Sequence, residues 1–413
     1  MTQPTGIDDD RQVVVVGAGP AGLTMARLLA ERGGVRVTVL DREAVAGGAP
    51  RHTDHLGFGL RDLHRLTSGP RYARRLLAAA QRAGAEVHTG ATVLAVEPGG
   101  SRALEVCLAT GERLAADAVV LATGVRERPR SARLVPGDRP AGVFTTGAVQ
   151  QVTALHHGRV GTRAVVVGAE HVSFSAIWSL HHGSCRTVAL VTPLPRHQTV
   201  AALRWFAAGL RRIPVRTGVE VAEIVGRGRV EAVVLTDGTR IDCDTVVFTG
   251  DWIPEHEVAR RAGLTMTPAA KGPAVDAAMR TSTRGLFAVG NLVHPAETAD
   301  RCALDAHAAS DAVRAWLTDR QWPAAIAPID VEPPLLWAAW CAGGVTARVE
   351  QPTTGRLEVS VDGVVVHRGR RRRLVPNRAL VVRNRRLAAL RSGAPDSAAL
   401  GDAAARLHVS IVR

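Results

Sequence analysis

The stretch that most constrains the fold is Val13–Gly22, where four valines run directly into a glycine-rich turn. Four consecutive β-branched residues predict a fully buried parallel strand, and residues 23–32 predict a helix. Strand, tight turn and helix are the context that a Gly-x-Gly-x-x-Gly match requires. Gly17 allows the turn, Gly19 lets a pyrophosphate approach the backbone, and Gly22 lets helix and strand pack closely. Because a helix N-terminus attracts anions, the stretch predicts dinucleotide binding.

An acidic residue follows at the spacing that this motif requires. The next predicted strand, residues 35–40, ends in Asp41, which lies 19 residues after Gly22. In such units an acid about 20 residues beyond the glycines accepts hydrogen bonds from a ribose. An ordinary strand-end carboxylate is the alternative interpretation, but the strand, the helix and the acid together favour the ribose.

Length and composition place the chain among ordinary globular proteins. Its 413 residues allow two or three domains, and 46% of them are hydrophobic and 22% charged. No apolar run reaches the roughly 18 residues of a transmembrane helix, and the acidic residues 7–10 are unlike a signal peptide. We therefore expect a cytoplasmic protein without a membrane segment.

The cysteines are far apart in the sequence, which argues against a local redox or metal motif. A Cys-x-x-Cys pair, a zinc knuckle and a compact iron–sulfur loop are all excluded by this spacing. We expect mostly buried free thiols and no metal site at the five positions Cys107, Cys185, Cys243, Cys302 and Cys341.

The net charge of +14 raises the question of nucleic-acid binding. The charge is uneven, because residues 351–413 contain thirteen arginines and only four acids. That tail has no aromatic side chain on which a base could stack. A solvated or partner-facing basic surface is therefore favoured over nucleic-acid binding.

The pattern of the first unit occurs a second time. Buried strands are predicted at residues 118–122, 163–167, 187–191 and 245–249, and helices at 70–83, 170–182, 199–210 and 300–317. The repeat predicts two doubly wound α/β units in tandem, and a proline-rich linker at 323–334 precedes a segment with strand-like alternation. We expect a first dinucleotide domain over 1–125, a second over 126–250, a returning segment over 251–325 and a separable, small all-β domain over 326–413.

Three motifs in this order resemble the flavoproteins with two dinucleotide-binding domains. They are residues 17–22, Ala122-Thr123-Gly124 and the stretch from Gly285 through Phe287 to Gly290 and Asn291. Thioredoxin reductase and the FAD subunits of opine oxidase and hydrogen cyanide synthase belong to this group. The resemblance covers about residues 10–320 and implies FAD as cofactor.

The resemblance also implies which residues hold FAD. Asp41 would bind the adenosine ribose, and Asn291 stands where these proteins usually have an aspartate on the ribityl chain; asparagine keeps an acceptor oxygen. Thr298 and Ala299 would begin a helix whose positive end faces the flavin pyrimidine and stabilises the anionic reduced flavin. The full set of implied FAD-binding residues is Gly17, Gly19, Pro20, Ala21, Gly22, Asp41, Arg42, Gly48, Arg51, His52, Val93, Thr123, Gly124, Gly290, Asn291, Thr298 and Ala299.

Two departures from the family pattern bear on the reaction. The disulfide reductases need a Cys-x-x-Cys at the flavin, and this chain has none. The second glycine motif reads Gly168-Ala-Glu-His-Val-Ser, so that Glu170 and Ser173 replace two glycines. A carboxylate repels a pyrophosphate and a Cβ blocks its approach, so NAD(P)H binding is possible but doubtful.

We therefore expect an FAD-dependent oxidoreductase that removes a hydride from a small amine or amino-acid-like substrate to flavin N5. Electrons would then pass to a carrier protein, a partner subunit or oxygen, and self-association is possible. The alternatives are an NAD(P)H-dependent flavin reductase and an FAD-stabilised subunit that binds a partner without catalysis. No acid–base pair stands out; His52 and His55 could act as a base or hold a substrate carboxylate, or His52 could merely anchor FAD.

Overall fold

The structure of the chain is a computed structural model. It describes residues 11–100, 102–199, 205, 212–323, 326, 328–384, 386–387 and 406–412. The predicted helix at 199–210 lies almost wholly outside these ranges. Among the described residues, no helix is long and apolar enough to cross a membrane.

A parallel five-stranded sheet forms the centre of the first unit. The valine run lies in its middle strand, where residues 13–15 are fully buried because strands flank it on both sides and layers cover both faces. In the order β20-β9-β1-β2-β5, the strands are β20 (Leu286–Ala288), β9 (Ala118–Leu121), β1 (Gln12–Val16), β2 (Arg36–Asp41) and β5 (Glu86–Thr89).

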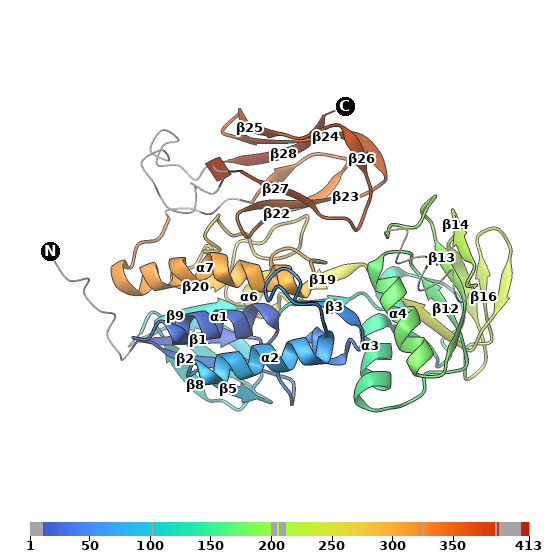
Figure 1. Cartoon of the computed structure of the whole chain (residues 1–413), viewed down its shortest axis with the longest axis horizontal. Helices are drawn as coiled ribbons and strands as arrows, with labels where there is room; N and C mark the ends of the chain where they lie inside the picture. The colour runs from blue at the N-terminus through green and yellow to red at the C-terminus, as the bar shows by residue number, and fades with distance from the viewer. Residues whose placement is uncertain are drawn as a thin grey trace.

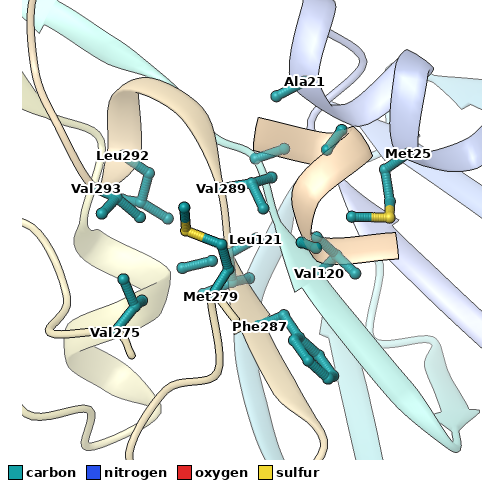
Figure 2. Packing of buried hydrophobic residues seen from close by; sticks show 14 of the residues in the cluster. Ala21, Met25, Val120, Leu121, Val275, Met279, Phe287, Val289, Leu292 and Val293 are labelled. Carbon is teal, nitrogen blue, oxygen red and sulfur yellow. The ribbon is translucent and has the colours of Figure 1, made fainter. Parts of the chain in front are cut away.

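Three helices cover one face of this sheet. Figure 1 shows α1 (Pro20–Glu31) lying between α2 (Gly69–Arg82) and α7 (Ala299–Asp319). Figure 2 shows side chains of α1, β9 and β20 meeting in the core, among them Met25, Leu121 and Phe287. An antiparallel meander adds to the unit, made of β6 (Val93–Pro98), β7 (Leu104–Leu108) and β8 (Arg113–Ala116).

The second unit repeats this plan, as the sequence predicted. Its parallel sheet has the order β11-β18-β12-β13-β14, and helices α3 (Thr146–Gln150) and α4 (His171–His182) pack together beside it. The strands are β11 (Val143–Thr145), β18 (Thr245–Phe248), β12 (Arg163–Val167), β13 (Arg186–Thr192) and β14 (Val215–Thr217), with a meander of β15 (Val221–Val225), β16 (Ala232–Leu235) and β17 (Arg240–Asp242).

Two short strands connect the units. The chain leaves the first unit through β10 (Val125–Glu127) and returns through β19 (Trp252–Pro254), and these strands pair antiparallel. The junction is therefore a hydrogen-bonded two-stranded ribbon. The remaining short elements are η1 (Ala49–His52), β3 (Leu56–Phe58), β4 (Thr67–Ser68), η2 (Arg130–Arg133), η3 (Gln151–Leu155), α6 (Glu257–Arg261) and η5 (Gly290–Leu292).

The C-terminal part is built from strands, as expected, and Figure 1 shows it lying over α7. Its apolar residues join those of the first unit in one buried cluster that extends from Val13 to Val409. Trp337 and Trp340 are buried in this cluster. One sheet is β22 (Leu335–Cys341), β23 (Gly344–Val349) and β27 (Leu380–Arg383), and the other is β21 (Asp330–Val331), β28 (Leu407–Val412), β24 (Thr353–Val361), β25 (Val364–Arg368) and β26 (Arg372–Leu374).

The predicted fold class is confirmed: two doubly wound α/β units with parallel sheets and a C-terminal β part. The domain boundaries at 125, 250 and 325 stay predictions. The shared core shows that the C-terminal sheets bury apolar surface of the first unit. All five cysteines are free.

Candidate functional site

The glycine loop after β1 has the geometry that its sequence predicts. Gly17 has a φ of +107°, and a Cβ there would overlap the carbonyl of Ala122 on the neighbouring strand. A Cβ on Gly22 would likewise overlap the carbonyl of Gly17. Gly19 differs, because no heavy atom lies within 4 Å of the position of its Cβ. Two glycines therefore allow close packing, whereas the third leaves space beside the backbone.

Helix α1 begins immediately at this space. Gly19 is its N-cap residue, Pro20 and Ala21 are its first residues, and no side chain caps its N–H groups. Pro lacks an N–H and is well suited to the first turn. An uncapped helix N-terminus beside an open backbone is suited to binding an anion.

Asp41 supports the glycine loop from the end of β2. Its carboxylate accepts hydrogen bonds from the N–H of Ala18 at 2.6 Å and from that of Glu43 at 2.8 Å. Each carboxylate oxygen keeps a second lone pair, which can accept a hydrogen bond from a ribose hydroxyl. The ribose contact itself stays a prediction. Val93 lies two residues beyond Ala91, whose N–H donates to the backbone carbonyl of Asp41. The exposed Arg42 side chain reaches Glu255 at 3.3 Å.

A second loop closes over the first. Gly48 has a φ of +61°, and its Cβ position would be 3.0 Å from the Cα of Gly19. Arg51 follows in η1 and donates to the carbonyl of Val45 at 2.9 Å, while its buried Nε has no partner among the described residues. His52 is 8% exposed, and its Nδ1 is also without a partner in this part of the chain. Burial lowers the pKa of His52 to about 4, so the ring is neutral at pH 7.

The other two FAD motifs, residues 122–124 and 285–291, approach the same loop. A Cβ added to Gly290 would lie 3.0 Å from the Cβ of Ala21. Gly124, with a φ of +76°, accepts from the N–H of Glu255, and the hydroxyl of Thr123 donates to the carbonyl of Glu255 at 2.7 Å. The carboxyl ends of β1, β9 and β20 thus bring three separate sequence motifs together.

The Asn291 side chain forms hydrogen bonds with the backbone of Glu297, six residues further along the chain. Its Oδ1 accepts from the N–H of Glu297 at 2.9 Å, and its Nδ2 donates to the carbonyl of Glu297 at 3.0 Å. A hydrogen bond to the ribityl chain, as predicted, would therefore have to form in addition to these two bonds of the Asn291 amide group. Thr298 is the N-cap residue of α7, and Ala299 its first residue, as predicted.

A buried acid that the sequence analysis missed occupies the first turn of α7. Asp300 accepts from the hydroxyl of Thr298, from the N–H of Arg301 at 3.1 Å and from the guanidinium of Arg61 at 2.9 Å. A negative group in the first turn of a helix offsets the positive end of its dipole. The field that α7 exerts is therefore weaker than its N-terminus alone would suggest.

Polar side chains from both units meet beside His52. Thr53 donates to Gln150 of α3 at 3.3 Å, and Gln150 donates to Ser175 of α4 at 3.0 Å. Ser175 also hydrogen-bonds with Nε2 of His55 at 2.7 Å. These hydrogen bonds connect the end of η1 to helices α3 and α4 of the second unit.

Glu127 is a second titratable group at the junction, and its side chain is half-buried. Its Oε2 accepts from the N–H of Gly147 at 2.8 Å, while its buried Oε1 has no partner among the described residues. Burial raises the pKa of Glu127 from 4.5 to about 7, despite the opposing effect of the Gly147 N–H and the charge of Arg133. A carboxyl group that titrates near neutrality is suited to proton transfer.

The second glycine motif holds a carboxylate of its own. Glu170 is buried at the N-cap of α4 and forms a capping box with Ser173. Its carboxylate accepts from the N–H of Ala169 at 3.0 Å and from the hydroxyl of Thr249 at 2.5 Å. The Thr249 hydroxyl also lies 2.7 Å from that of Ser173. The Glu170 carboxyl group thus lies at the N-terminus of α4, the part of the unit that binds a pyrophosphate in an intact glycine motif.

Sequence reasoning missed Glu127, Gln150 and Ser175 as well as Asp300. None of them belongs to a motif, and each forms a hydrogen bond with a residue that lies 20 to 239 positions away. What distinguishes these acids from surface acids is that Asp300 is buried and Glu127 half-buried, and the tertiary structure determines both environments.

The sequence is similar to those of known oxidoreductase components. The chain is 31% identical over 192 residues to the ferredoxin–NAD(+) reductase component of the biphenyl dioxygenase system of Paraburkholderia xenovorans (strain LB400), which covers 44% of this chain and 45% of the relative. It is 26% identical to one of the opine oxidase subunits of Rhizobium meliloti over 68% of this chain and 58% of that one. The match thus spans about half the length of such relatives.

A solved structure and a family model extend the comparison. The T. acidophilum thioredoxin reductase structure superposes with a TM-score of 0.62 and 22% identity, covering 74% of this chain and 98% of that one, and so shares the fold. The family model described as pyridine nucleotide-disulphide oxidoreductase matches residues 11–312. Since this range includes both α/β units, the chain belongs to the pyridine nucleotide-disulphide oxidoreductase family of FAD-dependent oxidoreductases.

Proposed function

We propose that the chain binds FAD at the Gly17–Gly22 loop and oxidises a small amine or amino-acid-like substrate. The electrons then pass to a carrier protein, a partner subunit or oxygen. The observation that carries this proposal is the Glu170 carboxylate at the N-terminus of α4, hydrogen-bonded to Ala169 and Thr249. A carboxylate at this position disfavours NAD(P)H, which makes an oxidisable amine the favoured source of reducing equivalents.

The residues of the first unit fit FAD. The space at Gly19 and the uncapped start of α1 suit a pyrophosphate. The unpartnered Nε of Arg51 can donate to a phosphate oxygen, and the unpartnered Nδ1 of His52 can bond to a polar group of the cofactor or the substrate. When bound, FAD supplies a two-electron acceptor that takes up a hydride at N5.

Two titratable groups divide the proton chemistry in this proposal. His52 is neutral at pH 7 because burial lowers its pKa to about 4, so it offers a hydrogen-bonding nitrogen without a charge. Glu127, with a pKa raised to about 7 by burial, is half ionised near neutrality and can accept the proton of an ammonium substrate. A neutral amine is the form that releases a hydride, because its nitrogen lone pair stabilises the developing cation.

The names of the relatives include both oxidases and reductases, so one alternative function is kept. The opine oxidase and sarcosine oxidase relatives are named as oxidase subunits, and several other relatives are named as NAD(+)-linked ferredoxin or rubredoxin reductases. An NAD(P)H-dependent reductase is therefore the alternative function. Neither is a disulfide reductase in this proposal, because all five cysteines are free and none lies near another in sequence.

Anaerobic reduction of the bound flavin tests the two functions against each other. The purified protein is mixed in turn with NADH, NADPH and a panel of secondary amines and amino acids, and the loss of flavin absorbance is followed by stopped flow. We expect bleaching by at least one amine and slow or absent bleaching by either nucleotide. Rapid reduction by micromolar NADH or NADPH would contradict the amine-oxidising proposal and support the reductase.

A further inference from the structure

The hairpin of β22 and β23 contacts the segment that follows β20 through buried polar groups. Glu297, which lies just before α7, accepts from the hydroxyl of Thr346 at 2.8 Å and from the guanidinium of Arg348 at 2.9 Å. Arg348 also donates to the carbonyl of Ala296 at 3.2 Å. Both Thr346 and Arg348 belong to β23, so the C-terminal sheet holds this segment directly.

These contacts are deeply buried. The exposed fractions are 8% for Glu297, 4% for Arg348 and 0% for Thr346. Burial would raise the pKa of Glu297, but the charges of Arg348, His294 and Arg301 lower it overall, so the carboxylate is ionised. Removing Arg348 would leave the buried Glu297 with the partly exposed Arg301, at 3.3 Å, as its remaining ion-pair partner, and the loss of a buried charge partner is costly.

A second contact holds the first turns of α7. Asp305 accepts from the N–H of Ala342 in the turn between β22 and β23 at 2.8 Å, and it pairs with the fully buried His294. The hairpin therefore holds both the segment before α7 and the helix itself.

The segment that β23 contacts, which ends at Glu297, includes Gly290 and Asn291 of the third FAD motif. The backbone of Glu297 makes both hydrogen bonds of the Asn291 side chain, and the preceding residue, Gly290, lies against Ala21 at the start of α1. A shift of Glu297 would move Asn291 relative to the glycine loop. Side-chain contacts from β23 thus extend through one residue to the proposed cofactor site.

We infer that Arg348 and Thr346 are positioning residues for FAD, acting through Glu297 on the Asn291 loop. The inference rests on the proposed FAD site of the first unit. It makes the C-terminal sheet part of the cofactor-binding structure, although its residues lie in a sequence region that the family model does not match. A purely structural role would change the stability of the protein without changing its affinity for FAD.

The test measures FAD affinity and thermal stability separately in the full chain. Arg348→Met removes the guanidinium at similar length, and Thr346→Val removes one donor at similar volume. Arg368→Met is the matched control, because Arg368 forms an exposed ion pair with Glu358 in the same C-terminal part. FAD affinity is measured by fluorescence quenching as FAD rebinds to the apoprotein, and the stability of the apoprotein by thermal unfolding.

We expect Arg348→Met to weaken FAD binding roughly tenfold or more, Thr346→Val about threefold, and Arg368→Met by less than about twofold. The double variant Glu297→Gln with Arg348→Met removes both deeply buried charges, leaving only the partly exposed Arg301 without its partner, and should recover part of the loss. Should Arg348→Met not fold, Thr346→Val and Arg348→Lys carry the test.

FAD affinities within about twofold of wild type in Thr346→Val and Arg348→Met, with only their stability lowered, would overturn this inference alone. A wild-type protein that binds no FAD would overturn it together with the proposed function.

Discussion

Replacing Glu170 by glycine should have opposite effects on stability and on nucleotide binding. In the folded protein its carboxylate caps α4, accepting from Ala169 and Thr249. Replacing an N-cap side chain by glycine costs only a few tenths of a kcal/mol, but loss of the buried hydrogen bond between Glu170 and Thr249 adds about 0.5–1.5 kcal/mol. Thr249 is not left unsatisfied, because without Glu170 its single hydroxyl hydrogen can be donated to the carbonyl of Val167 instead, and the hydroxyl still contacts Ser173. We therefore expect a loss of stability near the middle of that range.

The same change should improve binding of NADH or NADPH. A carboxylate facing a pyrophosphate costs of order 1–4 kcal/mol, depending on solvent access, which corresponds to roughly ten- to a thousandfold in Kd. Wild type should accordingly show millimolar or absent affinity. Adding Ser173→Gly should improve binding further, since the third glycine of an intact motif permits close packing of the helix.

Glu170→Gln separates charge from size in this experiment. It keeps the length of the side chain and an acceptor oxygen for Thr249, so it should restore less affinity than glycine does. Chemical denaturation measures the stability, and anaerobic stopped-flow reduction over a range of NADH and NADPH concentrations measures the affinity. Unchanged nucleotide affinity in Glu170→Gly, or tight binding by wild type, would refute the reasoning.

The remaining predictions concern the first unit and the junction. Gly19→Asp should abolish FAD binding, judged by flavin absorbance, yet leave apoprotein stability nearly unchanged because the Cβ position is open; Gly22→Ala should destabilise the apoprotein itself because its Cβ overlaps the Gly17 carbonyl. Burial raises the pKa of Glu127 from 4.5 to about 7, so its contribution to stability is present below pH 4.5 and lost as pH rises through about 7, by at most about 3 kcal/mol; Glu127→Gln should remove this slope in denaturation curves measured across pH. Burial lowers the pKa of His52 from 6.5 to about 4, so stability falls as pH drops through that range, and His52→Gln should flatten the acid side of the same profile.

Much of the fold could be predicted because its signals are local. The valine run, the turn glycines and the alternation of strands and helices each depend on neighbouring residues, and both parallel sheets form where these patterns lie. That Gly17, Gly22 and Asp41 come together could be predicted for the same reason, since their spacing within one strand–turn–helix unit requires them to meet.

Tertiary structure decided what the motifs alone leave open. Glu170 interrupts the second glycine motif in sequence, but only the approach of Thr249 shows that its carboxylate is a bonded helix cap rather than a free charge. Asn291 is hydrogen-bonded to Glu297, and Glu297 is hydrogen-bonded to Arg348. The sequence pattern reveals neither contact.

Glu127 and Asp300 are likewise ordinary acids in sequence. Their environments come from distant segments, Gly147 for one and Arg61 for the other. Local patterns determine where strands and helices form because backbone preferences and hydrophobic periodicity act over a few residues. Burial and charge pairing depend on which segments meet in space, so only the folded chain determines which acids titrate near neutrality and which part of the protein holds the cofactor loop.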